Sequence, residues 1–194
     1  MRAIMVLEES DKELIEACRR GDPEAFRALF ELHKDQVYSI ALRYSGDPAI
    51  AQDIAQETFL KLFTRIGSFR GESDFSSWLY RLVVNSCLDQ KRKTRRLAPL
   101  LDDALAILQA PDISALDEVV RAELSHHLRA VVEDLADEQR ILLVLRYTQG
   151  LSYDEIAAIL GTSNGTIASR LNRIHRTLER RLSRFATRKD RDHA

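Results

Sequence analysis

The chain has 194 residues, of which 45% are hydrophobic and 30% are charged, and its formal net charge is −1. These values describe a globular protein that is long enough for one large or two small domains. No stretch approaches the roughly 18 to 20 apolar residues that a membrane-spanning helix needs, and the N-terminus lacks the apolar run of a signal peptide. We therefore expect a cytoplasmic protein with no membrane insertion.

Residue patterns typical of a catalytic or metal site are lacking. The chain contains no G-x-x-x-x-G-K-[ST], no G-x-G-x-x-G after a strand and no G-x-S-x-G. His126 and His127 are neighbours, which point about 100° apart on a helix, so they do not form the same-face pair of a zinc protease. Cys18 and Cys87 lie far apart and in no C-x-x-C pair, which favours two reduced thiols. We therefore predict that the protein is not an enzyme and has no catalytic residues, no metal and no cofactor.

Helix signals recur along the whole chain, and no segment alternates as a strand of useful length would. Ser10 to Glu13 forms a capping box, and Asp22-Pro23 and Asp47-Pro48 each place a cap before a proline that the first helical turn tolerates. These signals predict helices over residues 11–20, 23–44 and 48–66, the last of them stopped by Gly67. The apolar positions expected to pack are Ala25, Leu29, Leu32, Val37, Ile40, Leu42, Ile54, Phe59, Leu62, Phe63 and Ile66.

An aromatic segment follows, SFRGESDFSSW from Ser68 to Trp78, which is too rich in Gly, Ser and Asp to be helical throughout. A helix is predicted from 76 to 95, and its end carries the basic run KRKTRR. Aromatic rings, an amide and arginines gather here, namely Phe69, Phe75, Trp78, Tyr80, Asn85, Arg70 and Arg81. Such a set suits the binding of unstacked bases. The alternative is that Phe75, Trp78 and Leu82 fill the core of the first domain.

Beyond this helix the sequence changes from basic to acidic. Leu97 to Val120 holds five acids and no base, and its two prolines bracket a segment that we interpret as a linker. Further helices are predicted over 118–134, 138–148, 152–160 and 163–185. The predicted fold is therefore all-α, with two small helical domains joined by an acidic linker. The expected boundaries are a first domain at 1–96, the linker at 97–116, a second domain at 117–185 and a basic tail at 186–194.

The sequence pattern of residues 151–182 is typical of a DNA-binding helix-turn-helix. Ser152 and Glu155 form a capping box, Gly161 ends the first helix, and Thr162 or Ser163 can cap the second. One stripe of the second helix is apolar, comprising Ile167, Leu171, Ile174, Leu178 and Leu182. The other side carries Thr166, Ser169, Arg170, Arg173, Arg176 and Arg180. This side suits phosphates and guanine edges in the major groove. The alternative is an ordinary helical hairpin with a solvated basic face.

Two pairs of motifs resemble a known family. Residues 53–59 (DIAQETF) and 69–85 (FRGESDFSSWLYRLVVN) resemble region 2 of bacterial RNA polymerase sigma factors of the extracytoplasmic-function (ECF) group. Residues 145–157 (LRYTQGLSYDEIA) and 165–171 (GTIASRL) resemble region 4 of the same factors. The matches stand in the family's order and cover most of residues 10–182.

The resemblance implies a sigma factor that binds core RNA polymerase, directs it to promoters through −35 and −10 elements and promotes strand opening. It implies that the polymerase clamp helices are bound by Asp53, Gln56, Glu57, Leu60 and Lys61. It implies that the −10 element, single-stranded in the bubble, is bound by Phe69, Arg70, Ser73, Phe75, Trp78, Arg81, Asn85, Lys91 and Arg92. The double-stranded −35 element would be bound by Asn164, Thr166, Ser169, Arg170, Arg173 and Arg176. The acidic linker would thread the polymerase cleft, and an anti-sigma factor would be a further partner.

Two positions depart from the family pattern. Ala168 stands where a basic residue is common, which leaves one fewer candidate DNA contact in the upstream reader. Leu135-Ala136 stands where Leu-Pro is common, which affects only how a helix starts.

Two other classes of function stay open at this point. A stand-alone transcriptional regulator can also end in a helix-turn-helix, but it usually needs a sensing or dimerising domain, and the N-terminal half has no apparent ligand-pocket signature. An enzyme acting on nucleic acid is disfavoured by the lack of clustered catalytic residues. Asp53 and Glu57 beside apolar Leu60 suit docking to a basic partner, and their alternative is an ordinary solvated helix face.

Overall fold

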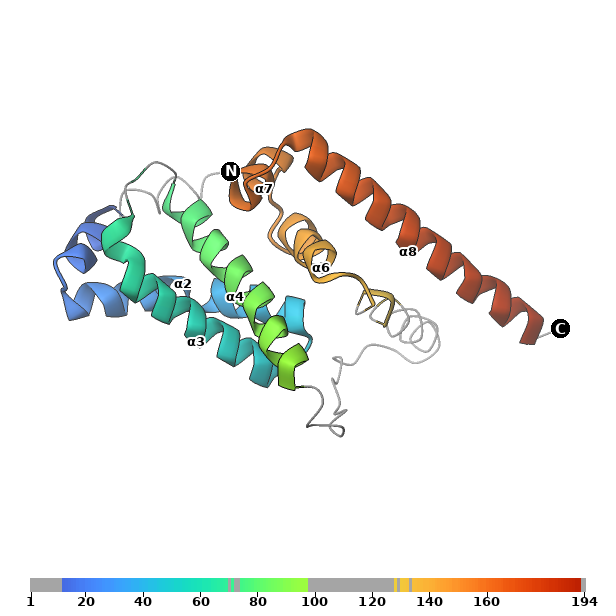
Figure 1. Cartoon of the computed structure of the whole chain (residues 1–194), viewed down its shortest axis with the longest axis horizontal. Coiled ribbons are helices and arrows are strands. Elements are labelled where there is room, and N and C mark those ends of the chain that lie inside the picture. The colour runs from blue at the N-terminus through green and yellow to red at the C-terminus, as the bar shows by residue number, and fades with distance from the viewer. Residues whose placement is uncertain are drawn as a thin grey trace, which may run out of the picture. The chain divides into compact units, whose positions relative to one another are not determined.

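A computed structural model describes residues 12–69, 71, 74–97, 128, 130–132 and 134–192, with side chains except at 91–97 and 184–192. Every element in these ranges is helical, which confirms the all-α prediction. The chain divides into two compact units, which are described separately below (Figure 1). The capping box at Ser10, residues 98–116 of the predicted linker and most of the predicted helix 118–134 lie outside the described residues.

The first unit contains a helix over residues 12–19, α2 (Pro23–Ser45), α3 (Pro48–Arg65), the 3₁₀ turn η1 (Ile66–Ser68) and α4 (Phe75–Leu97). The predicted caps are present at two helix starts. Asp22 Oδ1 accepts a hydrogen bond from Glu24 N at 2.9 Å, and Asp47 Oδ1 accepts one from Ala49 N at 2.7 Å. In both helices the proline after the cap occupies the first turn, where its missing N–H would have no helical partner.

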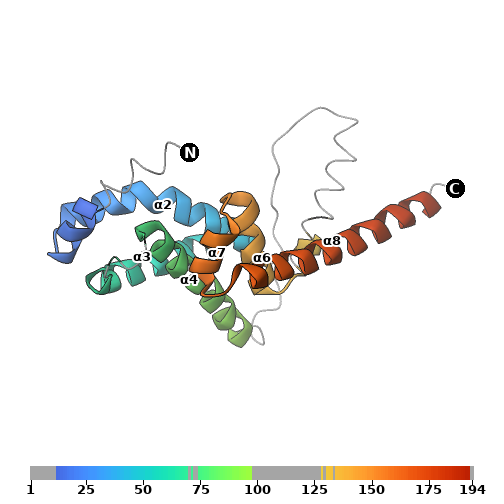
Figure 2. The same ribbon diagram turned by 90° about the horizontal axis from the view of Figure 1, so that it is seen from above.

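The helices α2, α3 and α4 pack on one another around a shared apolar core (Figure 2). Its largest fully buried side chains are Leu29, Val37 and Ile40 of α2 and Ile54 and Leu62 of α3. From α4 the buried side chains include Leu79, Leu82, Val83 and Cys87. A side-chain hydrogen bond also joins α2 to α4: Gln36 Nε2 donates to Tyr80 Oη at 2.8 Å.

Two of the positions expected to pack are exposed. Leu32 is 41% exposed, so its prediction was wrong. Phe63 is 38% exposed, but its ring still packs edge to face with the Phe26 ring, with centroids 4.8 Å apart. α2 buries Leu29, His33 and Val37 at spacings of four residues, and Leu32 lies about 100° around the helix from His33. The spacing of apolar residues therefore predicted the helix correctly but included an exposed position, Leu32, in its buried face.

The end of α3 also differs from the prediction. The α-helix stops at Arg65, and Ile66 to Ser68 continue as a 3₁₀ turn that contains Gly67. Gly67 therefore does not form a left-handed helix cap. The side chain of Ile66 is buried, which shows that the turn still packs against the unit's core.

The second unit contains helical residues 130–132, α6 (Asp137–Leu143), the π-helical turn η3 (Val144–Thr148), the first part of α7 (Tyr153–Leu160) and α8 (Asn164–Asp192). A single α-helix over 138–148 was predicted, but after Leu143 the backbone hydrogen bonds span five residues and not four. Gln149 N donates to Val144 O at 3.1 Å, five residues back, which makes this turn a π-helix. Apolar spacing does not reveal such a local insertion.

The core of the second unit comes from all of its main helices. The fully buried side chains are Ile141, Leu142, Leu145, Ile156, Ile167, Leu171 and Ile174. The apolar stripe predicted for the last helix is confirmed at its first three members, while Leu178 and Leu182 are half-buried. α8 continues to Asp192 as one uninterrupted helix, seven residues past the predicted end (Figure 2).

Within the described part of the chain, no helix combines the length and apolar character that crossing a bilayer requires.

Leu29 and Leu32 provide a matched test of the first unit's core, because they lie on the same helix with opposite burial. We expect Leu29→Ala to lower the free energy of unfolding by about 2 to 5 kcal/mol, since it removes a fully buried side chain. Leu32→Ala should stay within about 0.5 kcal/mol of the parent. Urea denaturation followed by circular dichroism measures both, and equal losses would contradict the packing described for α2.

Candidate functional site

A network of local hydrogen bonds closes both ends of α7. Glu155 Oε2 accepts from Ser152 N at 2.7 Å, and Ser152 Oγ accepts from Glu155 N at 3.2 Å, as the capping box predicts. At the other end Gly161 has a left-handed φ of 62°, and Thr162 N donates to Ala157 O at 3.0 Å. The short first helix of the predicted helix-turn-helix therefore begins and ends as its sequence indicated.

The start of α8 lies directly after this turn. Ser163 Oγ accepts from Thr166 N at 3.2 Å, so Ser163 rather than Thr162 is the cap. Asn164 Nδ2 donates to Asp154 Oδ1 of α7. The Asn164 amide is therefore held by an intramolecular bond, which leaves the positions after it as the nearer candidates for a base contact.

Beyond its first turn α8 has two opposite faces. Ile167, Leu171 and Ile174 are buried against the rest of the unit, and Thr166 is half-buried. The opposite side, called the basic face below, is exposed and comprises Ser169, Arg170, Arg173, Arg176 and Arg180. Among the described side chains, the guanidinium groups of Arg170, Arg173 and Arg176 have no intramolecular hydrogen bond or ion pair. Positive charge and free donors at the N-terminal half of a helix are suited to the phosphates and base edges of duplex DNA.

Two contacts that the sequence did not suggest brace α8. Tyr147 Oη lies 2.6 Å from His175 Nε2, across 28 residues of sequence. Arg181 Nη1 lies 3.2 Å from Asp134 Oδ2, across 47 residues. No motif or spacing marks these partners, because each pair meets only through the packing of the unit. They fix α8 at two further points along its length.

In the first unit three aromatic rings form a compact group around the start of α4. The centroids of Phe69 and Trp78 lie 5.2 Å apart, and Phe75 lies 5.8 Å from each of them. Phe75 is buried and also contacts His33, at 5.4 Å between centroids. Phe69 and Trp78 are half-buried, so part of each ring faces solvent. We call Phe69, Phe75 and Trp78 the aromatic cluster, in which Phe75 is the core member that the alternative interpretation anticipated.

The start of α4 holds the aromatic cluster in place. Asp74 Oδ1 accepts from Ser77 N at 2.7 Å, and Asp74 Oδ2 accepts from Ser77 Oγ at 2.8 Å. Trp78, Arg81 and Asn85 follow at helical spacings of three and four, which sets them on one side of α4. Arg81 is half-buried and Asn85 is exposed.

Four of the predicted −10 contacts have no described side chain. Arg70 and Ser73 lie outside the described residues, and Lys91 and Arg92 are described only as backbone within α4.

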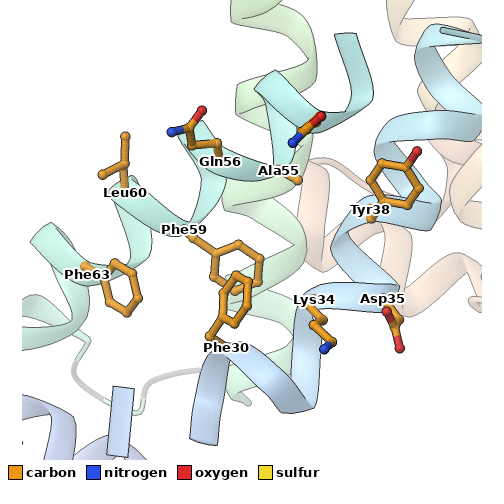
Figure 3. A pocket seen from close by; sticks show the side chains of 10 residues that line it. Phe30, Lys34, Asp35, Tyr38, Ala55, Gln56, Phe59, Leu60 and Phe63 are labelled. Atoms are coloured by element: carbon orange, nitrogen blue, oxygen red, sulfur yellow. The ribbon is translucent and has the colours of Figure 1, made fainter. Parts of the chain in front are cut away.

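A groove between α2 and α3 adjoins the predicted polymerase-binding residues (Figure 3). It has a volume of about 520 Å³ and is lined by Phe30, Lys34, Asp35, Tyr38, Gln52, Ala55, Gln56, Phe59, Leu60 and Phe63. The Phe30 and Phe59 rings pack edge to face with centroids 4.7 Å apart. Leu60 is 58% exposed, and Asp53 and Gln56 on the same helix are also exposed. This arrangement combines apolar surface with acidic and amide groups, which suits a protein partner.

Sequence reasoning missed the α2 side of this groove. Phe30 and Tyr38 are exposed aromatic residues that stand off the buried stripe of Leu29, His33 and Val37. Large apolar residues outside a helix's core stripe are the signal that could have found them. Below, Asp53, Gln56, Glu57 and Leu60 together with this groove are called the docking face.

Lys61, predicted as a polymerase contact, is turned towards α4. Its Nζ lies 3.1 Å from Glu57 Oε1, 3.0 Å from Asp89 Oδ2 and 3.2 Å from Ser86 Oγ. The Lys61 side chain is only 18% exposed. Its ammonium group therefore joins α3 to α4 and is not presented to solvent as Leu60 is.

The two cysteines take no part in these surfaces. Both are buried and neither is disulfide-bonded, and burial raises the pKa of the Cys87 thiol to about 12. A thiol with that pKa stays protonated at neutral pH and is a poor nucleophile or metal ligand. Within the described residues, no three His, Cys, Asp or Glu side chains are grouped so that they could hold a metal ion.

Comparison with known proteins assigns both units. The family model for Sigma-70 region 2 matches residues 29–97, and the model for Sigma-70, region 4 matches residues 126–178. The RNA polymerase sigma-H factor of Pseudomonas aeruginosa is 31% identical over 190 residues, which cover 92% of this chain and 96% of that protein. The ECF RNA polymerase sigma-E factor of Escherichia coli (strain K12) is 36% identical over 183 residues, which cover 89% of this chain and 94% of that protein. This chain belongs to the ECF group of RNA polymerase sigma factors.

Solved structures agree with this assignment. The sigma factor RpoE of Bartonella quintana, in complex with the anti-sigma factor NepR, has a TM-score of 0.62 and 26% identity, over 81% of this chain and 96% of that one. CnrH in complex with the cytosolic domain of CnrY has a TM-score of 0.63 and 22% identity, over 89% of this chain and 97% of that one, and supports the fold alone.

Membership in the family assigns this sigma factor to promoter-specific initiation of transcription by RNA polymerase. The match to region 2 contains the docking face and the aromatic cluster, and the match to region 4 contains α7 and the N-terminal half of α8. The motif resemblance noted in the sequence is therefore confirmed for both regions. The residue-level contacts and the boundaries at 96, 116 and 185 stay predictions.

Proposed function

We propose that this sigma factor docks on core RNA polymerase through the docking face and reads a −35 element with the basic face and a −10 element with the aromatic cluster. The observation that carries the proposal is that one small unit has two surfaces: the exposed Leu60 with acidic and amide neighbours, and an aromatic cluster in which Phe69 and Trp78 are half-buried. One surface suits a protein partner and the other suits bases. A unit with both can attach to an enzyme and deliver it to DNA.

At the upstream element we assign the base contacts to Thr166, Ser169, Arg170 and Arg173, near the start of α8. Recognition helices contact base edges with their N-terminal residues, while later residues reach the phosphates. Arg176 lies further along the exposed side of α8 and would bind the backbone. Ala168 is exposed on α8, so the position where the family commonly has a basic residue is accessible, but alanine offers no DNA contact there.

At the −10 element we assign base stacking to Phe69 and Trp78, which are half-buried, and positioning to buried Phe75. Asn85, which is exposed about two turns beyond Trp78 on α4, would hydrogen-bond the edge of an unstacked base. The basic end of α4 would follow the strand's phosphates.

Energetics argue that strand opening needs the polymerase. Opening about ten base pairs at about 1.4 kcal/mol per step costs roughly 14 kcal/mol. Two bases stacked on aromatic side chains return about 2 to 6 kcal/mol. The sigma chain alone therefore lacks the binding energy to hold a bubble, and the remainder must come from contacts that core polymerase supplies.

The proposal also extends to regulation and location. The NepR complex of the Bartonella relative supports an anti-sigma factor as a further partner, and the exposed apolar groove of the docking face offers such a protein a surface. The acidic linker would thread the polymerase cleft, where its charge keeps nucleic acid away. Action in the cytoplasm follows, because core polymerase works there.

Promoter opening tests the proposed function directly. We expect permanganate to modify unpaired thymines of a cognate promoter when the sigma factor is combined with core polymerase, and not when either is present alone. Co-elution with core polymerase in gel filtration should accompany this result, whereas a stand-alone regulator need not co-elute. If the isolated chain opens the promoter with the affinity of the holoenzyme, the proposal is wrong.

Leu60 tests the docking face. We expect Leu60→Asp to weaken binding to core polymerase by about 1.5 to 3 kcal/mol, since docking would bury this side chain. Leu32→Asp is the matched control, because Leu32 is also an exposed leucine of the first unit but does not line the groove. Fluorescence anisotropy with labelled sigma factor measures both affinities, and equal effects of the two substitutions would contradict this docking surface.

Arg170 tests upstream recognition. We expect Arg170→Ala to weaken holoenzyme binding to the cognate −35 element by about 1 to 3 kcal/mol and to have little effect on a scrambled element. Arg180→Ala, three turns further along the basic face, should instead reduce binding to both sequences and lower the salt dependence. A uniform loss for Arg170→Ala would show that Arg170 contacts phosphate and not a base.

A further inference from the structure

His33 is a polar side chain in the core of the first unit. It is 5% exposed and lies on the buried side of α2, four residues after Leu29 and seven before Ile40. Those two neighbours on the stripe are aliphatic and fully buried. An imidazole costs more to remove from water than an aliphatic side chain of similar size. Apolar packing alone would therefore favour a leucine at position 33, and the contacts of the His33 ring supply a reason for a histidine.

The His33 ring packs against the buried member of the aromatic cluster. Its centroid lies 5.4 Å from that of Phe75, and the two ring planes are inclined at 53°. Phe75 in turn contacts the two half-buried rings, Phe69 and Trp78, with centroids 5.8 Å away in each case. These four rings form a continuous series that begins in the core of the unit and ends at its surface.

This contact joins the aromatic cluster to a second helix. The hydrogen bonds between Asp74 and Ser77 hold the start of α4 locally, whereas His33 belongs to α2. Aromatic rings prefer particular tilted and edge-on arrangements, so one flat ring restricts the orientation of the next. A leucine could fill the same space but would give Phe75 no planar surface to pack against. A ring at position 33 therefore sets the orientation of Phe75 with respect to α2.

We propose that His33 is a positioning residue for the −10 element, which holds Phe75, and through it the two half-buried rings, in the arrangement that stacks unpaired bases. This inference rests on the proposed −10 role of the aromatic cluster. Because His33 is buried, it acts on bases only through the rings of that cluster. Loss of its ring should therefore change how bases are held and leave the phosphate contacts as they are.

Tryptophan fluorescence of the isolated full chain gives the first test. Trp78 is the only tryptophan of the chain, so its emission reports on the aromatic cluster alone. We expect His33→Leu, which removes the ring, to shift this emission to longer wavelength and to increase its quenching by acrylamide, because a loosened indole meets more water. His33→Phe keeps a ring and should match the parent. Ile40→Ala is the control, since it truncates a buried side chain two turns away on the same side of α2 and should leave Trp78 unchanged.

DNA binding by the holoenzyme, at saturating core polymerase, gives the second test. Two fork-junction DNAs are compared, which differ only in whether the unpaired −10 strand carries its bases or abasic sites. The ratio of the two affinities isolates the base contacts from the phosphate contacts, which both DNAs share. We expect His33→Leu to lower this ratio about 3- to 10-fold, as a weakened base-stacking contact would do. His33→Phe and Ile40→Ala should keep it within about twofold of the parent ratio.

Several results would overturn the inference. A parental Trp78 spectrum for His33→Leu would show that the His33 ring does not position the cluster, and a parental affinity ratio would show that its positioning does not matter for bases. Equal effects of His33→Leu and Ile40→Ala would make His33 an ordinary core residue. A His33→Phe variant that resembles His33→Leu would assign the role to the polarity of the imidazole and not to its ring. If the parent holoenzyme binds both DNAs equally, the −10 proposal fails, and the fluorescence result still decides whether His33 orients the cluster.

Discussion

The packing of α4 against α2 and α3 is the constraint on which the first unit depends. Leu79, Val83 and Cys87 are buried, and this sets the rotation of α4 about its own axis. The same rotation leaves Asn85 exposed and the Trp78 ring half-exposed on the other side of the helix. The side chains that we assign to promoter DNA are thus oriented by residues buried in the core of the unit. A helix is rigid over this length, so the buried stripe and the exposed one cannot be chosen independently.

In the second unit, too, the buried side of a helix determines which side chains are exposed. Ile167, Leu171 and Ile174 are buried on the side of α8 that packs within the unit, where α8 contacts α6, and the arginines of the basic face occupy the remaining side. Capping bonds at Ser152 and Ser163 define where each helix begins. Because the start of α8 is set by a local bond, the turn of the helix on which Arg170 lies is fixed relative to the cap. Reading a base edge, the role that we propose for Arg170, requires a side chain held at a defined position.

Under the proposed function each unit binds a different promoter element, and an energy comparison explains why core polymerase would be needed as well. The aromatic cluster can stabilise a few unstacked bases, and the basic face can bind duplex DNA, but their summed energy is smaller than the cost of opening a bubble. In the proposed function, the docking face would resolve this deficit by attaching both surfaces to core polymerase, which would supply further contacts to DNA.

Sequence by itself determined the helices, their caps and the family. Asp22, Asp47 and the Ser152 and Glu155 pair act within four residues, so their effects can be read without tertiary structure. Only the tertiary structure decided which aromatic side chains are buried, that Leu32 and Phe63 are exposed, that a π-turn interrupts the helix after Leu143, and that Lys61 meets Asp89 28 residues away. These outcomes depend on how helices that are distant in sequence pack together. Apolar periodicity predicts which face of a helix is buried but not which residues of another helix that face will contact.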